Sequence, residues 1–132
     1  MVMKKVALDT NVVIEIMRGN SKVIQQIEDF QLFCVPVTVC GELLFGVYNS
    51  LRSESELQKY HRFMSTAEVL EVNIGVVENY AKIRHKLKQK GRPIPENDIW
   101  IAAIAMSNDI LLLSNDEHFL EIDDLNFVYV EK

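Results

Sequence analysis

The feature that most constrains this chain is the regular alternation of short apolar runs with longer segments of helical pattern. The apolar runs lie at residues 6–8, 32–35, 69–72, 110–113 and 127–130. They are too short for helices, and the run at 110–113 is apolar throughout, which is typical of a strand covered on both faces. Strands that alternate with helices predict an α/β domain with a mainly parallel central sheet.

The intervening segments carry signals for the beginning and end of helices. Helices are expected at residues 10–18, 21–29, 38–49, 53–65, 73–90 and 98–107. Thr38 is expected to cap the helix at 38–49, because a Thr side chain accepts hydrogen bonds from free backbone N–H groups. Gly91 is expected to end the helix at 73–90, and Pro93 and Pro95 delay the next helix until Asp98.

Acidic residues recur where these elements meet. Asp9 and Asp116 each follow a predicted strand, Glu42 lies in the first turns of the helix after the second strand, and Asp98 opens the last long helix. In a parallel sheet the carboxyl ends of the strands lie at one edge, and ligand sites form there. We therefore expect Asp9, Glu42, Asp98 and Asp116 to converge on one spot.

Converging carboxylates repel one another, and a divalent cation removes this conflict. Ligand sets made of oxygen atoms alone favour Mg²⁺ or Mn²⁺, and one or two such ions could activate water for phosphodiester hydrolysis. Each acid also has a simpler interpretation. Asp9 and Asp98 could cap helices, Glu42 could face solvent, and Asp116 could be a turn residue.

Composition limits the classes of protein that remain. Among the 132 residues, 48% are hydrophobic and 25% charged, so residues 1–132 are expected to form a single domain with one core. The net charge of −5 disfavours binding to nucleic acid through bulk positive charge. Cys34 and Cys40 are too few for a disulfide framework and are expected in the core. No signal peptide or membrane-spanning run is visible, so a cytoplasmic protein is expected.

The acids lie in motifs that resemble a known family. The motifs are LDTN at residues 8–11, TVCGELLFGV at 38–47, NDIWIAA at 97–103 and SNDEHF at 114–119. In this order and spacing they resemble the PIN-domain ribonucleases, and within them the VapC-type toxins of toxin–antitoxin pairs. The resemblance implies a PIN-like α/β/α sandwich and cleavage of RNA with Mg²⁺ or Mn²⁺ by a toxin whose partner is a VapB-like antitoxin.

The resemblance also implies roles for individual residues. Asp9, Glu42, Asp98 and Asp116 match the catalytic, metal-binding acids, and Asn11 and Ser114 match polar residues that support them. The roles of Glu96, Asn115 and Glu117 stay open. For Glu96 we favour a simple charge at a helix N-terminus over a position at a second metal.

The helices at residues 12–17 and 43–48 carry more apolar surface than a lone domain needs. The resemblance implies that such surfaces serve a homodimer, an antitoxin segment and a larger toxin–antitoxin assembly; the alternative is ordinary packing in the core. The alternative function is a non-catalytic RNA- or protein-binding module with the same fold. A phosphotransfer domain is disfavoured, because Asp9 is followed by Thr10 and Asn11 and begins no DxD pair.

A basic segment occupies the end of the helix at 73–90. It contains Lys82, Arg84, Lys86, Lys88, Lys90 and Arg92. This segment could bind RNA phosphates, or it could be a solvated face whose lysine stems cover the apolar edge of the helix. The histidines, His61, His85 and His118, lack metal-ligand spacing and are expected to be surface or structural residues. Trp100 is expected in the core.

Overall fold

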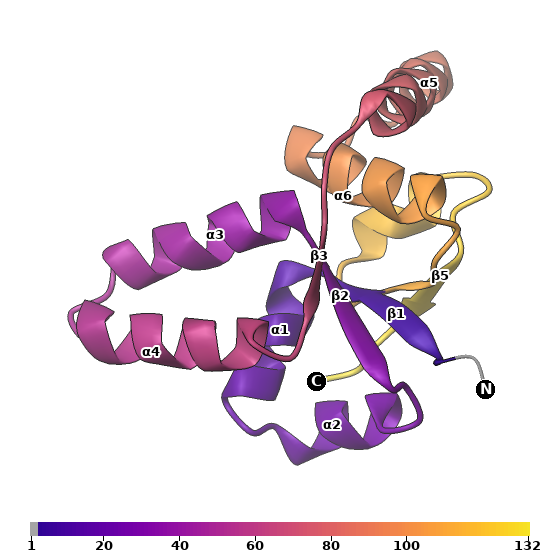
Figure 1. The fold of residues 1–132 in the computed structure, drawn as a ribbon. Coiled ribbons are helices and arrows are strands. Elements are labelled where there is room, and N and C mark those ends of the chain that lie inside the picture. Colours follow the sequence, from indigo (N-terminus) through magenta and orange to yellow (C-terminus); the bar gives the residue numbers. More distant parts are fainter. Residues whose placement is uncertain (1–2) are drawn as a thin grey trace.

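The protein is described by a computed structural model for residues 3–132, and its centre is a parallel sheet (Figure 1). The five strands run in the order β3-β2-β1-β4-β5, and every neighbouring pair is parallel. Their bounds are Lys5–Leu8 for β1, Leu32–Pro36 for β2, Glu68–Leu70 for β3, Leu112–Ser114 for β4 and Phe127–Tyr129 for β5. The prediction of an α/β fold with a parallel sheet is confirmed.

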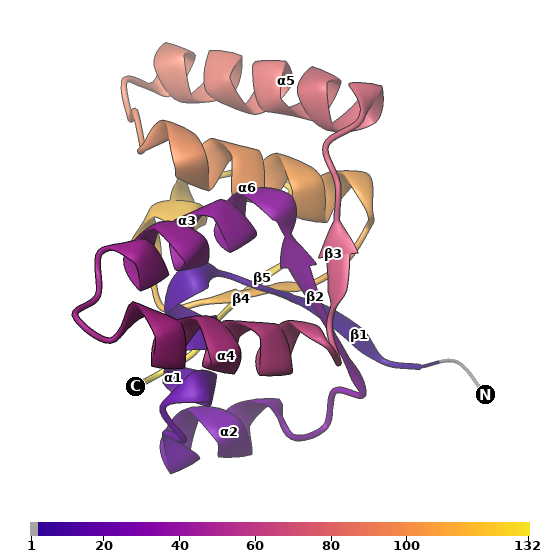
Figure 2. The same ribbon diagram turned by 60° about the vertical axis from the view of Figure 1, so that its left-hand side comes forward.

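Helices cover both faces of the sheet. Their bounds are Thr10–Met17 for α1, Ser21–Ile27 for α2, Val37–Tyr48 for α3, Ser53–Met64 for α4, Ile74–Lys90 for α5 and Glu96–Ser107 for α6, and a short 3₁₀ helix, η1, spans Glu117–Glu121. α6 packs on one face with α5 on its outer side, and α1 and α2 lie on the opposite face (Figure 2). α3 and α4 form a hairpin that projects beyond the sheet (Figure 1). No helix in the described part of the chain is both long and apolar enough to cross a membrane.

The strand order reverses between β1 and β4. Their register pairs Ala7 with Leu112 and Leu8 with Leu113, and the backbone N–H of Asp9 donates to the carbonyl oxygen of Leu113 at 3.0 Å. The carboxyl ends of the two strands therefore lie side by side. In open α/β sheets, such a reversal point opens a crevice in which ligands bind.

The helices α3 and α6 begin earlier than the sequence predicted. Each follows a proline, Pro36 or Pro95, and neither proline makes a side-chain cap. The ring of proline fixes φ at a value that suits the entry to a helix, so each of these prolines takes the N-cap position and no side chain caps the helix. The predictions that Thr38 caps α3 and that Asp98 opens α6 are therefore wrong. Asp98 lies inside the first turn of α6, and its carboxyl group makes no cap.

Three other local predictions have clear outcomes. Gly91 ends α5 in the left-handed conformation at φ 68°, as predicted. β4 begins at Leu112 instead of residue 110, because the backbone N–H of Ile110 bonds to the carbonyl oxygen of Ala105 and thereby closes α6. Cys34 and Cys40 are buried and free, as expected.

Candidate active site

The carboxyl group of Asp9 lies at the end of β1 and is held by two donors. The backbone N–H of Thr10 donates to Oδ1 at 2.8 Å, and the hydroxyl of Ser114 donates to Oδ2 at 2.6 Å. Ser114 ends β4, is fully buried, and accepts a hydrogen bond from the backbone N–H of Asp116 at 3.0 Å. One buried hydroxyl thus joins the residues that follow the two central strands.

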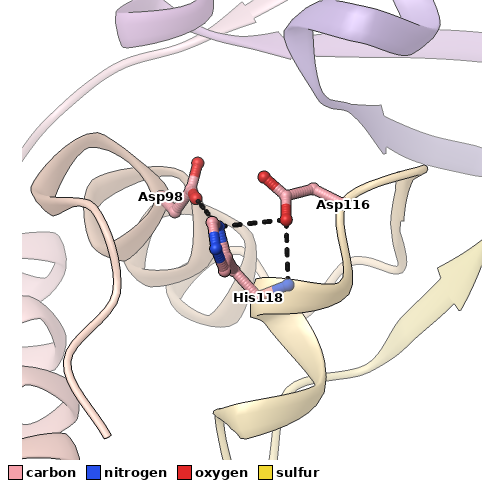
Figure 3. Close-up of side chains that lie close together, drawn as sticks. All are labelled: Asp98, Asp116 and His118. Carbon is pink, nitrogen blue, oxygen red and sulfur yellow. Dashed lines mark hydrogen bonds and ion pairs between the residues drawn. The ribbon is translucent and has the colours of Figure 1, made fainter.

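Asp116 and His118 form the next part of the site. Asp116 caps η1, because its Oδ1 accepts the backbone N–H of His118 at 2.9 Å. The same oxygen lies 3.0 Å from Nδ1 of His118, and that nitrogen also lies 3.1 Å from Oδ2 of Asp98 on α6 (Figure 3). The imidazole therefore stands between two carboxylates that come from different elements.

The electrostatics of the site favour a cation. Burial raises the pKa of Asp98 to about 6, the hydrogen bond from His118 opposes this, and the charges of Asp116 and Asp9 add to it. Burial also raises the pKa of Asp9, although the bonds from Ser114 and Thr10 counteract it. The hydrogen bond to Asp98 raises the pKa of His118. Carboxyl groups whose ionisation is disfavoured in this way gain from a divalent ion that neutralises them.

Glu42 lies on α3, apart from this cluster but within reach of its charge. Its side chain is exposed overall, yet partial burial of the carboxyl group and the charge of Asp9 raise its pKa. The hydroxyl of Thr10 lies near this carboxyl group but outside hydrogen-bonding geometry, so it stays buried without a partner. Among the described residues Glu42 makes no hydrogen bond or ion pair of its own.

The donor set suits a divalent metal ion. Asp98, Asp116 and His118 each offer one ligand atom, and these atoms lie within 4.8 Å of one another. Carboxylate oxygens are ligands for Mg²⁺ and Mn²⁺, and an imidazole nitrogen is a ligand for transition ions. The residues present therefore fit such an ion.

Comparison with known proteins gives the family. The family model of the PIN domain matches residues 6–125. The chain belongs to the PIN domain family. Ribonuclease VapC1 of Haemophilus influenzae (strain R2866) is 32% identical over 126 residues, which cover 91% of this chain and 93% of that protein. The tRNA(fMet)-specific endonuclease VapC of Shigella flexneri is 28% identical over 90% of this chain and 92% of that protein.

Solved structures agree with this assignment. The VapBC-1 structure from nontypeable Haemophilus influenzae matches with a TM-score of 0.88 at 26% identity, covering 97% of this chain and 99% of that chain. The DNA-bound VapBC structure from Salmonella typhimurium also matches with a TM-score of 0.88, at 25% identity. The predicted resemblance to PIN-domain, VapC-type proteins is thus confirmed.

The side chains of Asn11 and Glu96 make no hydrogen bond or ion pair with the acids of this PIN domain in the described part of the chain. The side chain of Asn11 is exposed and makes no hydrogen bond within the described structure. Glu96 lies in the first turn of α6, where its carboxylate accepts a hydrogen bond from the hydroxyl of Tyr80 at 2.5 Å and pairs with Arg84 at 3.6 Å. The ring of Tyr80 stacks on Trp100 at 3.9 Å, so Trp100 is partly buried between α5 and α6.

The basic segment of the PIN domain faces two groups of acids. Arg84 pairs with Glu96, as described above, whereas the cations nearer the end of α5 meet acids that follow β4. These pairs are Lys86–Asp124 at 3.6 Å, Lys90–Asp123 at 2.8 Å and Arg92–Glu121 at 3.4 Å. Lys82 and Lys88 form no ion pair with the residues that the structure describes. The predicted RNA-binding set is therefore divided between two regions of the surface.

Sequence reasoning missed His118 as a member of the site. It was expected to be a surface or structural residue, and its side chain is in fact half exposed. The available signal was local. Asp116 caps the turn that carries His118, which places the imidazole beside the Asp116 carboxylate. Its contact with Asp98 joins residues 20 positions apart and has no local signal.

Proposed function

We propose that residues 1–132 form one PIN domain that acts as a metal-dependent endoribonuclease, the toxin of a toxin–antitoxin pair. The observation that carries this proposal is the cluster at the reversal point of the sheet. There Ser114 links Asp9 to Asp116, and His118 links Asp116 to Asp98. The names of the VapC relatives support RNA as the substrate.

The acids Asp9, Glu42, Asp98 and Asp116 are proposed to hold one or two Mg²⁺ or Mn²⁺ ions. Such ions supply activation of water and stabilisation of the leaving oxygen during phosphodiester hydrolysis. The chain itself orients the ligands. Ser114 and the backbone of Thr10 orient the Asp9 carboxylate and favour its ionised form against the effect of burial, because both donate hydrogen bonds to it.

An RNA cleavage assay tests the proposed activity. The purified protein is incubated with a pool of small RNAs in Mg²⁺, in Mn²⁺ or in EDTA, and Asp98→Asn is prepared in parallel. We expect discrete fragments that require the metal and disappear in Asp98→Asn. Asp109→Asn is the matched control, because Asp109 is an exposed residue at the opposite end of α6 and the chemical change is the same.

The alternative binding module gives a different result. The non-catalytic interpretation would be supported by two results together. RNA would bind the wild-type protein equally well with and without EDTA, and neither the wild type nor Asp98→Asn would cleave it. Co-purified antitoxin must be excluded first, because it would mask the activity. A denaturing purification followed by refolding removes it.

The same proposal places the antitoxin in a groove between α1, α3 and α4. The groove measures about 440 Å³, reaches Glu42 at one end, and has apolar walls formed by Ile14, Met17, Leu43 and Val47. Beside it, Phe45 and Tyr48 expose 68% and 71% of their surface. Such exposed apolar residues next to a groove are typical of an interface.

Exposed positions allow this placement to be tested without disturbing the core. Phe45→Ser and Tyr48→Ser are expected to reduce co-purification with an antitoxin co-expressed from the neighbouring gene. Ile74→Ser is the matched control, because Ile74 is 74% exposed on α5, outside the groove. Equal retention by all three variants would contradict the proposed location. Self-association is followed separately by the mass of the protein in solution.

A further inference from the structure

His118 makes two contacts that are unusual for one ring nitrogen. Its Nδ1 lies 3.1 Å from Oδ2 of Asp98 and 3.0 Å from Oδ1 of Asp116 (Figure 3). A ring nitrogen carries at most one proton, so it cannot donate a full hydrogen bond to both carboxylates. The one proton of this nitrogen is therefore shared between the two acids, and a cation bound to all three atoms would take the place of that proton.

The spacing of the three donor atoms suits a common metal ion. Adjacent ligands of an octahedral ion with bonds of about 2.1 Å lie about 3.0 Å apart. Both nitrogen–oxygen separations have this value, and all three donor atoms lie within 4.8 Å of one another. Two of the three separations among the donor atoms are thus those that neighbouring ligands of such an ion need.

His118 is also held firmly by the elements around it. The residue before it begins η1, and the residue after it, Phe119, is 1% exposed and packs against Phe127. The cap made by Asp116 fixes the backbone of His118 on the other side. A ligand on a backbone fixed at both sides loses little freedom on binding an ion.

We propose that His118 is a nitrogen ligand of the metal site and that it shifts the preference of the site from Mg²⁺ toward Mn²⁺. The inference rests on the proposed function, because it concerns the metal of that same site. Mg²⁺ strongly prefers oxygen ligands, whereas imidazole binds first-row transition ions well. A ligand set of two carboxylates and one imidazole therefore discriminates between Mg²⁺ and Mn²⁺ better than a set of carboxylates alone.

The direct test is pulsed electron paramagnetic resonance of Mn²⁺ bound to the full chain. A coordinated imidazole nitrogen couples to the electron spin of Mn²⁺ and modulates the signal. We expect this nitrogen coupling in the wild type and its loss in His118→Ala. His61→Ala and His85→Ala are matched controls and should keep the coupling, because both residues lie outside the cluster.

A titration measures the preference itself. Mn²⁺ and Mg²⁺ affinities are determined by calorimetry for the wild type, for His118→Ala and for His118→Asp. We expect His118→Ala to weaken Mn²⁺ binding about tenfold or more, and Mg²⁺ binding by less. His118→Asp restores an oxygen ligand and is expected to shift the preference back toward Mg²⁺.

The outcomes separate the two proposals. Bound Mn²⁺ without nitrogen coupling in the wild type would overturn the role of His118 and leave the proposed nuclease intact, since the imidazole would then be displaced by the ion. Coupling that persists in His118→Ala would overturn it as well. If Mn²⁺ binds no better to the wild type than to Asp98→Asn, the metal site and the inference both fail. If His118→Ala does not fold, coupling that is kept by both His61→Ala and His85→Ala assigns the nitrogen to His118, the third of the three histidines, and loss of the coupling in either would overturn the role of His118.

Discussion

At the scale of single residues, Ser114 connects the acids of the site. It is fully buried, donates to the carboxylate of Asp9 and accepts from the backbone of Asp116. Its bond is the largest of the interactions that lower the pKa of Asp9 and so oppose the effect of burial. A small buried hydroxyl thus keeps one carboxylate available and positions the next.

Ser114→Ala is expected to weaken binding of Mn²⁺ by about 10–100-fold, the usual effect of removing a group that supports a metal ligand. Without the hydroxyl, Asp9 loses a donor and its pKa rises further, so less of the charged form is present to bind the ion. Calorimetric titration at neutral pH measures the effect. Ser107→Ala, at an exposed position at the end of α6, is the control. Unchanged affinity in Ser114→Ala would contradict this role.

At the scale of elements, helix beginnings and ends position the site. The helices α3 and α6, which carry Glu42 and Asp98, both begin directly after a proline. Because Pro95 takes the N-cap position, Asp98 lies within the first turn of α6, where its carboxyl group contacts His118 and caps nothing. α5, in contrast, ends at Gly91, whose positive φ allows the chain to turn toward α6.

Replacement of Gly91 by Ala is expected to lower the free energy of unfolding by about 1 kcal/mol, because a side chain is strained at φ 68°. Gly46→Ala should instead raise it by about 0.5–1 kcal/mol, since Gly46 lies within α3 and an added Cβ meets nothing within 4 Å. Urea unfolding measures both values. A stabilising effect at Gly91, or a loss of stability at Gly46, would contradict these local interpretations.

The division of the basic segment also gives a prediction at this scale. Arg84 pairs with Glu96 in the turn that carries Asp98, whereas Lys86 faces Asp124. Arg84→Gln is therefore expected to weaken RNA binding more than Lys86→Gln. Each lost phosphate contact should also make the affinity less dependent on salt. For single-stranded RNA, the slope of the logarithm of the affinity against the logarithm of the salt concentration should become shallower by about 0.7 per contact. RNA binding is measured in EDTA at several salt concentrations. An equal loss of RNA affinity in Arg84→Gln and Lys86→Gln would contradict a greater role for Arg84.

At the scale of the whole molecule, the fold gathers negative charge at one edge of the sheet. The pKa values of Asp9, Glu42 and Asp98 are all raised, with burial as the largest cause in each case. The folded chain therefore binds protons more strongly than the unfolded chain at these positions. Such a site costs stability when it is charged and empty, and a bound cation offsets that cost.

The stability of the metal-free protein is expected to fall as pH rises. Asp98 has a pKa of about 6 in the folded chain against 3.8 unfolded, so protonation favours the folded state and this contribution is lost as pH rises through 6. The raised pKa of His118 acts in the same direction. Urea unfolding in EDTA at pH 5 and pH 8 should differ by about 1–3 kcal/mol.

Two comparisons check the origin of this pH dependence. Asp98→Asn is expected to make the dependence flatter, because it removes the carboxyl group whose pKa is raised to about 6. Saturating Mn²⁺ should stabilise the wild type more at pH 8 than at pH 5, because the ion competes with protons for the same ligands. If the free energy of unfolding in EDTA rises from pH 5 to pH 8, titratable groups other than Asp98 and His118 determine its pH dependence.

The alternation of apolar runs and the order of the motifs were enough to predict the parallel sheet and to group Asp9, Glu42, Asp98 and Asp116 at its carboxyl edge. This is possible because the carboxyl ends of parallel strands share one edge whatever the details of packing. In the structure Ser114 and His118 link Asp9, Asp116 and Asp98, whereas Glu42 makes no hydrogen bond within the described residues. The helix starts after Pro36 and Pro95 were missed, although their signal was local. The contact of His118 with Asp98 and the ion pairs of Lys86 and Lys90 depend on how distant elements pack. Such side-chain contacts have no sequence period, so only the tertiary structure decides them.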